Sequence, residues 1–128
     1  MDRSKDWIDE AEGDLEHAKS DSKQGFYNWA CFSAQQSAEK ALKAVFQSMH
    51  AEAWGNCVAD LLQELSKKQD VANELMEAAL ELDKAYIPTR YPNAHPSGSP
   101  RRKYTKEESA RLISHAERIL RFCSGLLP

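Results

Sequence analysis

The chain has 128 residues with 17 basic and 20 acidic side chains, so its formal net charge is −3. This length suits a single domain, residues 1–128, whose core needs neither metal ions nor disulfides for support. No apolar run reaches the roughly 20 residues that span a bilayer, and residues 1–6 lead into no apolar signal segment, so we expect neither a membrane anchor nor a secretory signal.

Two long helices are predicted in the first half of the chain. Proline is absent before Ile87 and no segment alternates like a strand, so only helices are expected. The first should run from Asp2 or Ser4 to Ser20, because its apolar residues recur on one helical face. The second should run from Tyr27 to His50, and its stripe of small residues allows a neighbouring helix to approach closely. That stripe consists of Ala30, Ala34, Ala38 and Ala41.

Three further helices are predicted in the second half. A short one carries apolar residues from Val58 to Leu65, with Asn56 as its N-cap. The next should run from Asp70 to Tyr86. The last begins with a capping box, Thr105 to Glu108, and stops at Gly125. The sum is an all-α protein, an antiparallel up-and-down bundle of four long helices plus one short inserted helix.

The segment between the last two helices, Ile87 to Tyr104, is a long loop with four prolines. Loops of this length are usually functional or disordered, and its aromatic residues favour an ordered one. Residues 84–106 contain six basic side chains and no acidic one, whereas the rest of the chain has a balance of −9. The basic segment either attracts a phosphate or docks on the acidic body of the protein.

Arg90 and His95 in this loop are the candidate catalytic pair. Arginine can hold a phosphate through two parallel hydrogen bonds, and histidine can exchange a proton near neutral pH. Metal-independent RNA cleavage needs both capacities. In the alternative interpretation, Arg90 forms a salt bridge with a helix and His95 is solvated. The candidate substrate-binding residues, which could hold the RNA backbone and a base, are Tyr91, Arg101, Arg102, Lys103 and Tyr104.

No metal site, cofactor or cysteine nucleophile is predicted. His17, His50 and His115 share no helical ligand spacing and are expected on the surface. The three cysteines are odd in number and widely spaced, which favours a reducing cytoplasm over a disulfide scaffold. Neither Cys31 nor Cys57 has a basic neighbour, so we interpret both as small core residues.

The second helix carries two features outside its alanine stripe. Phe32 and Phe46 flank Glu39 and Lys43 on another face, and we interpret the two aromatics as exposed residues at the interface of a homodimer. The Gln35–Gln36 pair is either solvated or makes a polar contact at a helix or subunit interface.

Four blocks of the sequence resemble the HEPN family in its single-domain prokaryotic form. They are Asp14-Leu15 with Ala18, the run from Trp29 to Lys43, Leu82-Asp83-Lys84, and the run from Tyr86 to Pro92. The blocks cover nearly the whole chain and keep the order and spacing of the family. The resemblance implies an up-and-down helical bundle, commonly a homodimer. It also implies a frequent partner, a minimal nucleotidyltransferase, in pairs that often act as toxin and antitoxin.

The resemblance further implies a site. Ribonuclease members carry an arginine and a histidine at the spacing of Arg90 and His95, and the motifs of two subunits face each other in one metal-free site. Tyr91 stands where active members often have a small polar residue, and Ser97 where some toxins have tyrosine. Three interpretations follow: a toxin-like ribonuclease, a non-catalytic subunit that binds nucleotide or a nucleotidyltransferase, and a purely structural bundle.

Overall fold

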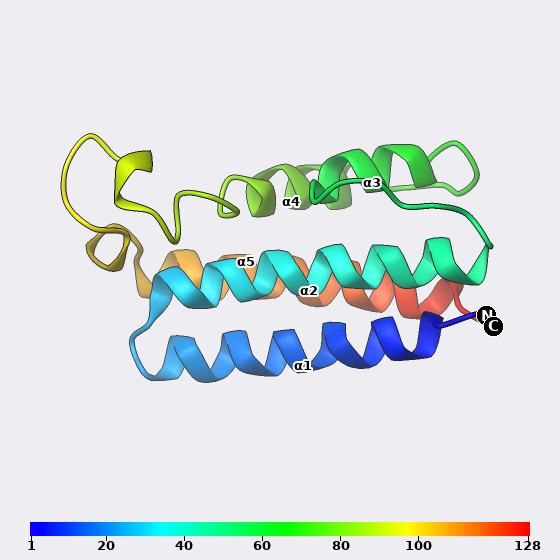
Figure 1. The fold of residues 1–128 in the computed structure, drawn as a ribbon, viewed down its shortest axis with the longest axis horizontal. Coiled ribbons are helices and arrows are strands. Elements are labelled where there is room, and N and C mark those ends of the chain that lie inside the picture. Colours follow the sequence, from blue (N-terminus) through cyan, green and yellow to red (C-terminus); the bar gives the residue numbers. More distant parts are fainter.

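The computed structural model describes residues 1–128 and contains α-helices but no strand, which confirms the all-α prediction. The helices are α1 (Ser4–Lys23), α2 (Tyr27–Ser48), α3 (Val58–Leu65), α4 (Asn73–Asp83) and α5 (Lys106–Leu126). α1, α2 and α5 lie along the long axis of the molecule, and the loop between α4 and α5 lies at the end opposite both chain termini (Figure 1). None of the helices combines the length and the apolar character that crossing a membrane requires.

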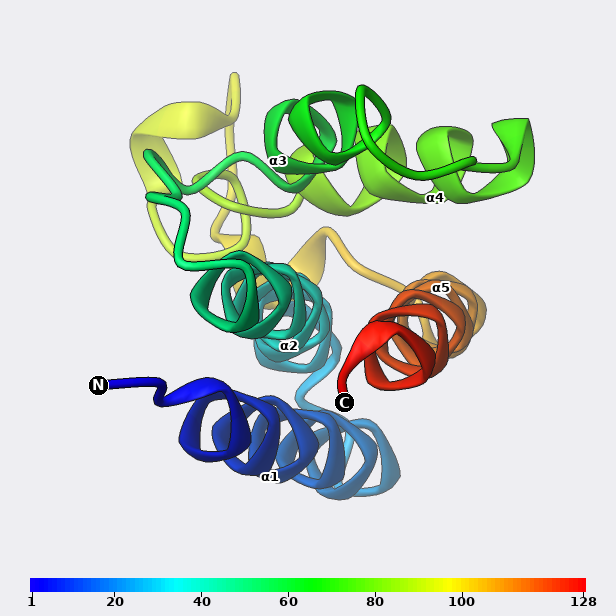
Figure 2. The ribbon, with the colours of Figure 1, turned by 90° about the vertical axis from the view of Figure 1, so that its right-hand side faces the viewer.

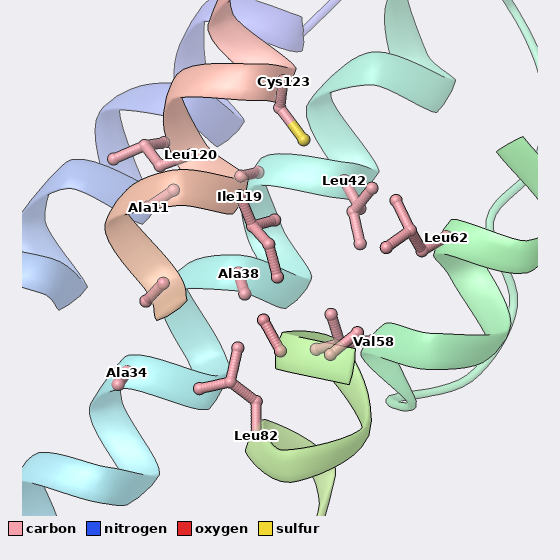
Figure 3. Packing of buried hydrophobic residues seen from close by; sticks show 14 of the residues in the cluster. Ala11, Ala34, Ala38, Leu42, Val58, Leu62, Leu82, Ile119, Leu120 and Cys123 are labelled. Carbon is pink, nitrogen blue, oxygen red and sulfur yellow. The ribbon is translucent and has the colours of Figure 1, made fainter. Parts of the chain in front are cut away.

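α2 forms the centre of the bundle and contacts each of the other four helices. In the view along the axis, α1 covers one side of α2, α3 and α4 cover the opposite side, and α5 packs alongside (Figure 2). The predicted alanine stripe of α2 is fully buried, which allows the neighbouring backbones to approach closely. Leu42, Leu62, Leu82 and Ile119 point toward one another from α2, α3, α4 and α5 and are fully buried (Figure 3).

The ends of α1 and α2 differ from their predicted positions because residues in the left-handed conformation terminate both helices. α1 continues past Ser20 to Lys23, and Gly25, at φ 86°, follows it. α2 stops at Ser48, and His50, at φ 55°, is the left-handed residue that follows this helix. At both ends, backbone N–H groups beyond the helix satisfy carbonyl groups of its last turn.

α4 and α5 also differ in length from their predictions. α4 is shorter than the predicted span, because the chain leaves the helix after Asp83 in a series of turns. The capping box of α5 is confirmed: the Glu108 N–H donates to Thr105 Oγ1 at 3.0 Å, and the Thr105 N–H donates to Glu108 Oε1 at 3.3 Å. α5 runs through Gly125 to Leu126, since a glycine within a helix costs only about 1 kcal/mol and Leu126 packs against the core.

The N-terminus of α3 is capped from α4 and not by Asn56. The carboxylate of Asp83 accepts hydrogen bonds from the backbone N–H groups of Val58 and Ala59, both at 2.8 Å. It also accepts the thiol hydrogen of Cys57 at 2.9 Å. A negative charge at this position satisfies two free N–H groups and complements the positive end of the helix.

Two residues of α2 point inward. Gln35 is fully buried. Its Nε2 donates to the Asn56 carbonyl at 2.8 Å and to Oδ1 of Asp83 on α4 at 3.4 Å, which confirms for Gln35 the predicted polar contact at a helix interface. Phe46 is only 5% exposed and belongs to the hydrophobic core, so its prediction as an exposed interface residue is wrong. Phe32 is half-buried and borders the loop between α4 and α5.

Candidate functional site

The beginning of the long loop, residues Pro88–Arg90, is tied to the bundle by buried hydrogen bonds. Thr89 is fully buried, and its Oγ1 donates to the Ala85 carbonyl at 2.6 Å. Asn28 of α2, also buried, donates from Nδ2 to the Thr89 carbonyl at 3.0 Å. No sequence pattern singles out Asn28, because its partner lies 61 positions away. These contacts fix the backbone against α2 at the point where Arg90 leaves it.

Arg90 places its guanidinium on an aromatic surface. The guanidinium carbon lies 4.3 Å from the ring centre of Phe32, 5.1 Å from that of Tyr86 and 5.0 Å from that of Tyr91. Its Nε donates to the Tyr86 carbonyl at 3.2 Å. The salt bridge of the alternative interpretation is absent. Only Nε forms a hydrogen bond within the protein, so the N–H groups of the two terminal nitrogens stay free for a bidentate contact with phosphate.

His95 folds back over the same stretch of backbone. Its Nε2 lies 2.6 Å from the carbonyl oxygen of Pro88, and its ring meets Tyr104 edge-on with 6.3 Å between ring centres. The side chain is therefore half-buried and not fully solvated. The loop closes on itself, so that Arg90 and His95 both contact the short backbone segment 86–91.

The two tyrosines among the predicted binding residues differ in role. Tyr104 is half-buried against His95, and burial raises the pKa of its phenol to about 12, so it remains protonated at neutral pH. Tyr91 is 47% exposed and leaves ring surface on which a base could stack.

Arg101, Arg102 and Lys103 are exposed where the loop approaches α5, the first two in the turn Pro100–Arg102. None of the six basic side chains in residues 84–106 forms a salt bridge. The loop therefore packs on the body of the protein through the hydrogen bonds of Thr89 and not through ion pairs of these cations.

Sequence reasoning missed Trp29, which extends the aromatic surface along α2. Trp29 is 46% exposed and meets Phe32 edge-on with 6.1 Å between ring centres. Phe32 lies a further 6.1 Å from Tyr86. We call Trp29, Phe32, Tyr86 and Tyr91 the aromatic strip. The i,i+3 spacing of Trp29 and Phe32 is the signal in the sequence that indicates a shared helix face.

The cysteines are thiols packed in or beside the core, as predicted. Burial raises the pKa of Cys31 to about 12. Burial together with the hydrogen bond to Asp83 raises the pKa of Cys57 to about 11. Cys123 is fully buried, which also raises its pKa. None of the three forms the thiolate that a nucleophile requires at neutral pH.

The histidines outside the loop confirm the surface prediction in two cases of three. His17 and His50 are exposed. His115 is instead half-buried between α4 and α5, with its Nε2 2.6 Å from Oε1 of Glu81. Its prediction as a surface residue is wrong, because the partner comes from another helix.

Residues 4–126 match the sequence pattern of the HEPN domain. The chain belongs to the HEPN domain family. Among curated proteins, this HEPN chain is similar to one of Methanocaldococcus jannaschii named "Putative toxin MJ1304". The two are 28% identical over 131 residues, which cover 94% of this chain and 86% of the relative.

Solved structures of similar sequence have the same helical architecture. The protein TT1696 from Thermus thermophilus is 46% identical, with a TM-score of 0.96, and the match covers 99% of this chain and 100% of that one. The HEPN domain protein TM0613 from Thermotoga maritima is 57% identical, with a TM-score of 0.78 over 94% and 95% of the chains. The archaeal HEPN homologue ST0689 is 38% identical, with a TM-score of 0.83 over 98% of both chains.

Proposed function

We propose that this HEPN protein is a toxin-like, metal-independent endoribonuclease of the cytoplasm, with Arg90 and His95 as its catalytic residues. The observation that carries the proposal is the closure of the loop, which brings a guanidinium without a salt bridge and an imidazole to one backbone segment. The relative named as a toxin supports the biological role. Arg101, Arg102 and Lys103 are cations without salt bridges that can hold the RNA backbone.

The reaction follows from the chemistry of the two side chains. His95 takes the proton of a 2′-hydroxyl, and the 2′-oxygen attacks the adjacent phosphorus while the bond to the 5′-oxygen breaks. Arg90 stabilises the negative charge that develops on the phosphate. A protonated His95 of a second copy can give a proton to the leaving 5′-oxygen. The products are a 2′,3′-cyclic phosphate and a free 5′-hydroxyl.

The deciding experiment incubates purified protein with a mixed RNA pool in EDTA. We expect cleavage to 2′,3′-cyclic phosphate ends, and no cleavage of DNA of the same sequences, because DNA lacks the attacking hydroxyl. His95→Ala should abolish cleavage and keep RNA binding, and His50→Ala, which changes an exposed histidine at the end of α2, is the matched control. Intact RNA after incubation with the wild-type protein, freed of any co-purified partner, overturns the proposal.

A second candidate function is a non-catalytic subunit that binds nucleotide and partners a minimal nucleotidyltransferase. The observation that favours it is the position of the Tyr91 ring beside the Arg90 guanidinium. The neighbouring cations Arg101, Arg102 and Lys103 can hold a phosphate group whether or not a bond is cleaved. In this function, ATP alone should raise the melting temperature by mass action, and added salt should weaken the effect steeply.

The triple replacement of Arg101, Arg102 and Lys103 by alanine tests the anion site common to both functions. These side chains are exposed and form no salt bridge, so the variant should fold like the wild type. It should lose the stabilisation by ATP and most RNA affinity. Replacing Arg118 and Arg121 of α5, which are exposed but lie away from the loop, is the control. Unchanged binding by the triple variant overturns the anion site.

A further inference from the structure

We infer that His95 exchanges its proton through Nδ1, and that the Pro88 carbonyl, held in place by Asn28 and Thr89, decides this choice of nitrogen. The inference rests on the proposed function, since it names the reacting atom of that site. It also makes Asn28 a positioning residue, one that acts on the reaction through the backbone of the loop.

The contact between His95 and Pro88 determines which nitrogen carries the hydrogen. Nε2 lies 2.6 Å from the Pro88 oxygen, which is hydrogen-bonding distance. A carbonyl oxygen can only accept, so Nε2 must be the donor in the neutral as well as the protonated ring. In the neutral ring Nδ1 then has a free lone pair, and no protein group is hydrogen-bonded to it. Nδ1 is therefore the nitrogen able to receive the proton of a substrate hydroxyl.

The carbonyl that selects the tautomer is itself held firmly. Proline restricts rotation on its own φ, and the next residue, Thr89, is fully buried. Thr89 is bonded on both sides, through its Oγ1 to the Ala85 carbonyl and through its carbonyl to Nδ2 of Asn28. These buried hydrogen bonds hold Thr89 in position, and with it one end of the peptide unit that carries the Pro88 carbonyl, so this carbonyl has less freedom to turn away from His95.

The environment of the ring supports the same assignment. Tyr104 meets the imidazole edge-on, with an angle of 86° between the ring planes, and so limits its rotation. The Tyr104 phenol is protonated at neutral pH and does not compete as a base. Arg90 contacts the adjacent Tyr86 carbonyl and carries no basic lone pair. Of these three side chains, His95 is the one with a free basic lone pair, and that lone pair is on Nδ1.

Nitrogen-15 NMR of the histidine rings tests the tautomer without any RNA. At alkaline pH the long-range proton–nitrogen spectrum of the wild-type protein should show His95 protonated at Nε2. The His95 signals are identified as those missing from the spectrum of His95→Ala. His50, exposed and without a side-chain hydrogen bond, should show a mixture of the two tautomers and serves as the internal control. A His95 ring protonated at Nδ1, or a mixture like that of His50, overturns the inference.

The positioning role of Asn28 is tested by Asn28→Ala. We expect kcat for RNA to fall about tenfold with KM nearly unchanged, and the His95 ring to shift toward a mixture of tautomers. Thr89→Val, which keeps the shape of the side chain and removes the bond to the Ala85 carbonyl, should act in the same direction if Asn28→Ala fails to fold. A normal kcat together with an unchanged tautomer in a folded variant overturns the positioning role.

The two assays separate this inference from the proposed function. A wild-type protein with His95 protonated at Nε2 that leaves RNA intact overturns the ribonuclease and with it the reaction at Nδ1. A protein that cleaves RNA while its resting His95 is protonated at Nδ1 overturns the inference alone.

Discussion

At the residue scale, Arg90 is unusual because an aromatic surface and a backbone carbonyl replace the carboxylate partner that an arginine often has. This arrangement suits a planar guanidinium, which can stack on Phe32 and present two parallel N–H groups to a phosphate. The ammonium group of a lysine can neither stack on a ring nor present two parallel N–H groups to a phosphate. The identity of this cation, and not only its charge, therefore matters for the proposed reaction.

We predict that Arg90→Lys keeps the fold but retains only a small part of the wild-type rate of RNA cleavage. Loss of a well-placed donor to the transition state costs about 3 kcal/mol, so kcat/KM should fall on the order of a hundredfold. Arg121→Lys, at an exposed arginine paired with Glu117, is the control and should be neutral. Single-turnover rates on one defined RNA provide the measurement. Wild-type rates for Arg90→Lys would show that the guanidinium has no special role.

Asp83 joins two helices through one carboxylate, and its removal should be costly. Asp83→Ala leaves the N–H groups of Val58 and Ala59 without their acceptor, and we expect a loss of about 2 kcal/mol in the free energy of unfolding. Asp60→Ala, in the first turn of the same helix but exposed, removes only a favourable helix-end charge and should cost about 0.5 kcal/mol. Urea unfolding measures both variants. Equal losses for the two would contradict the capping role.

At the element scale, α4 and α5 are joined by a polar contact beside their apolar one. Glu81 of α4 accepts hydrogen bonds from Arg111 at 2.8 Å and from His115 at 2.6 Å, both on α5. The Arg111 guanidinium, with a smaller effect of His115, lowers the pKa of Glu81 below its usual 4.5. Because the folded-state pKa is lowered, this stabilisation is complete above the ordinary carboxyl pKa and is lost as the pH falls through the lowered value.

Glu81→Gln should therefore destabilise the protein in a pH-dependent way. At pH 7 we expect a loss of about 0.5–1 kcal/mol, a modest value because Glu81 is partly exposed and screened by solvent. The difference from wild type should narrow at an acidic pH below the usual 4.5, as the pH falls through the lowered pKa and the wild-type carboxyl also becomes neutral. Urea unfolding at both pH values is the measurement. Glu64→Gln, at an exposed carboxylate paired with Lys67, is the control. A difference that does not change with pH would contradict the charge-based explanation.

At the scale of the whole molecule, the basic segment 84–106 and the aromatic strip lie at the same end of the bundle. The basic residues of the loop lie opposite the chain termini, while the rest of the chain has a balance of −9 (Figure 1). An acidic body repels RNA, so the loop is the part of the surface where RNA can approach. The aromatic strip adjoins this loop, and exposed aromatic surface is typical of an interface.

We predict a homodimer that buries the Trp29 end of the aromatic strip and leaves the Tyr91 end beside the RNA. A closed twofold dimer is the commonest assembly of a small chain and would bring two copies of Arg90 and His95 together. Light scattering should give twice the chain mass of 14.5 kDa. Trp29→Ser should shift the protein toward the monomer. Trp54→Ser, at a residue 78% exposed and outside the strip, should not. A wild-type mass near 14.5 kDa contradicts both the dimer and the two-copy site.

The elements that the sequence predicted well are those that depend on residues close to one another in the chain. Helical periodicity places the apolar residues of each helix, and the capping box from Thr105 to Glu108 lies within four consecutive residues. The burial of the alanine stripe follows from its spacing on α2. Residue type together with the family resemblance also singled out Arg90 and His95 as a candidate pair, whose catalytic role stays a prediction.

The features that only the tertiary structure decided depend on partners far apart in the chain. The cap of α3 comes from Asp83, 25 positions from Val58, and the anchor of the loop comes from Asn28, 61 positions from Thr89. Phe46 is buried in the core, beside residues 49–54 after α2 and Leu65 of α3, which helical periodicity cannot reveal. A sequence shows which groups can donate, accept or be buried. The packing of the helices decides which of these groups meet, because hydrogen bonds and van der Waals contacts act only over a few ångströms.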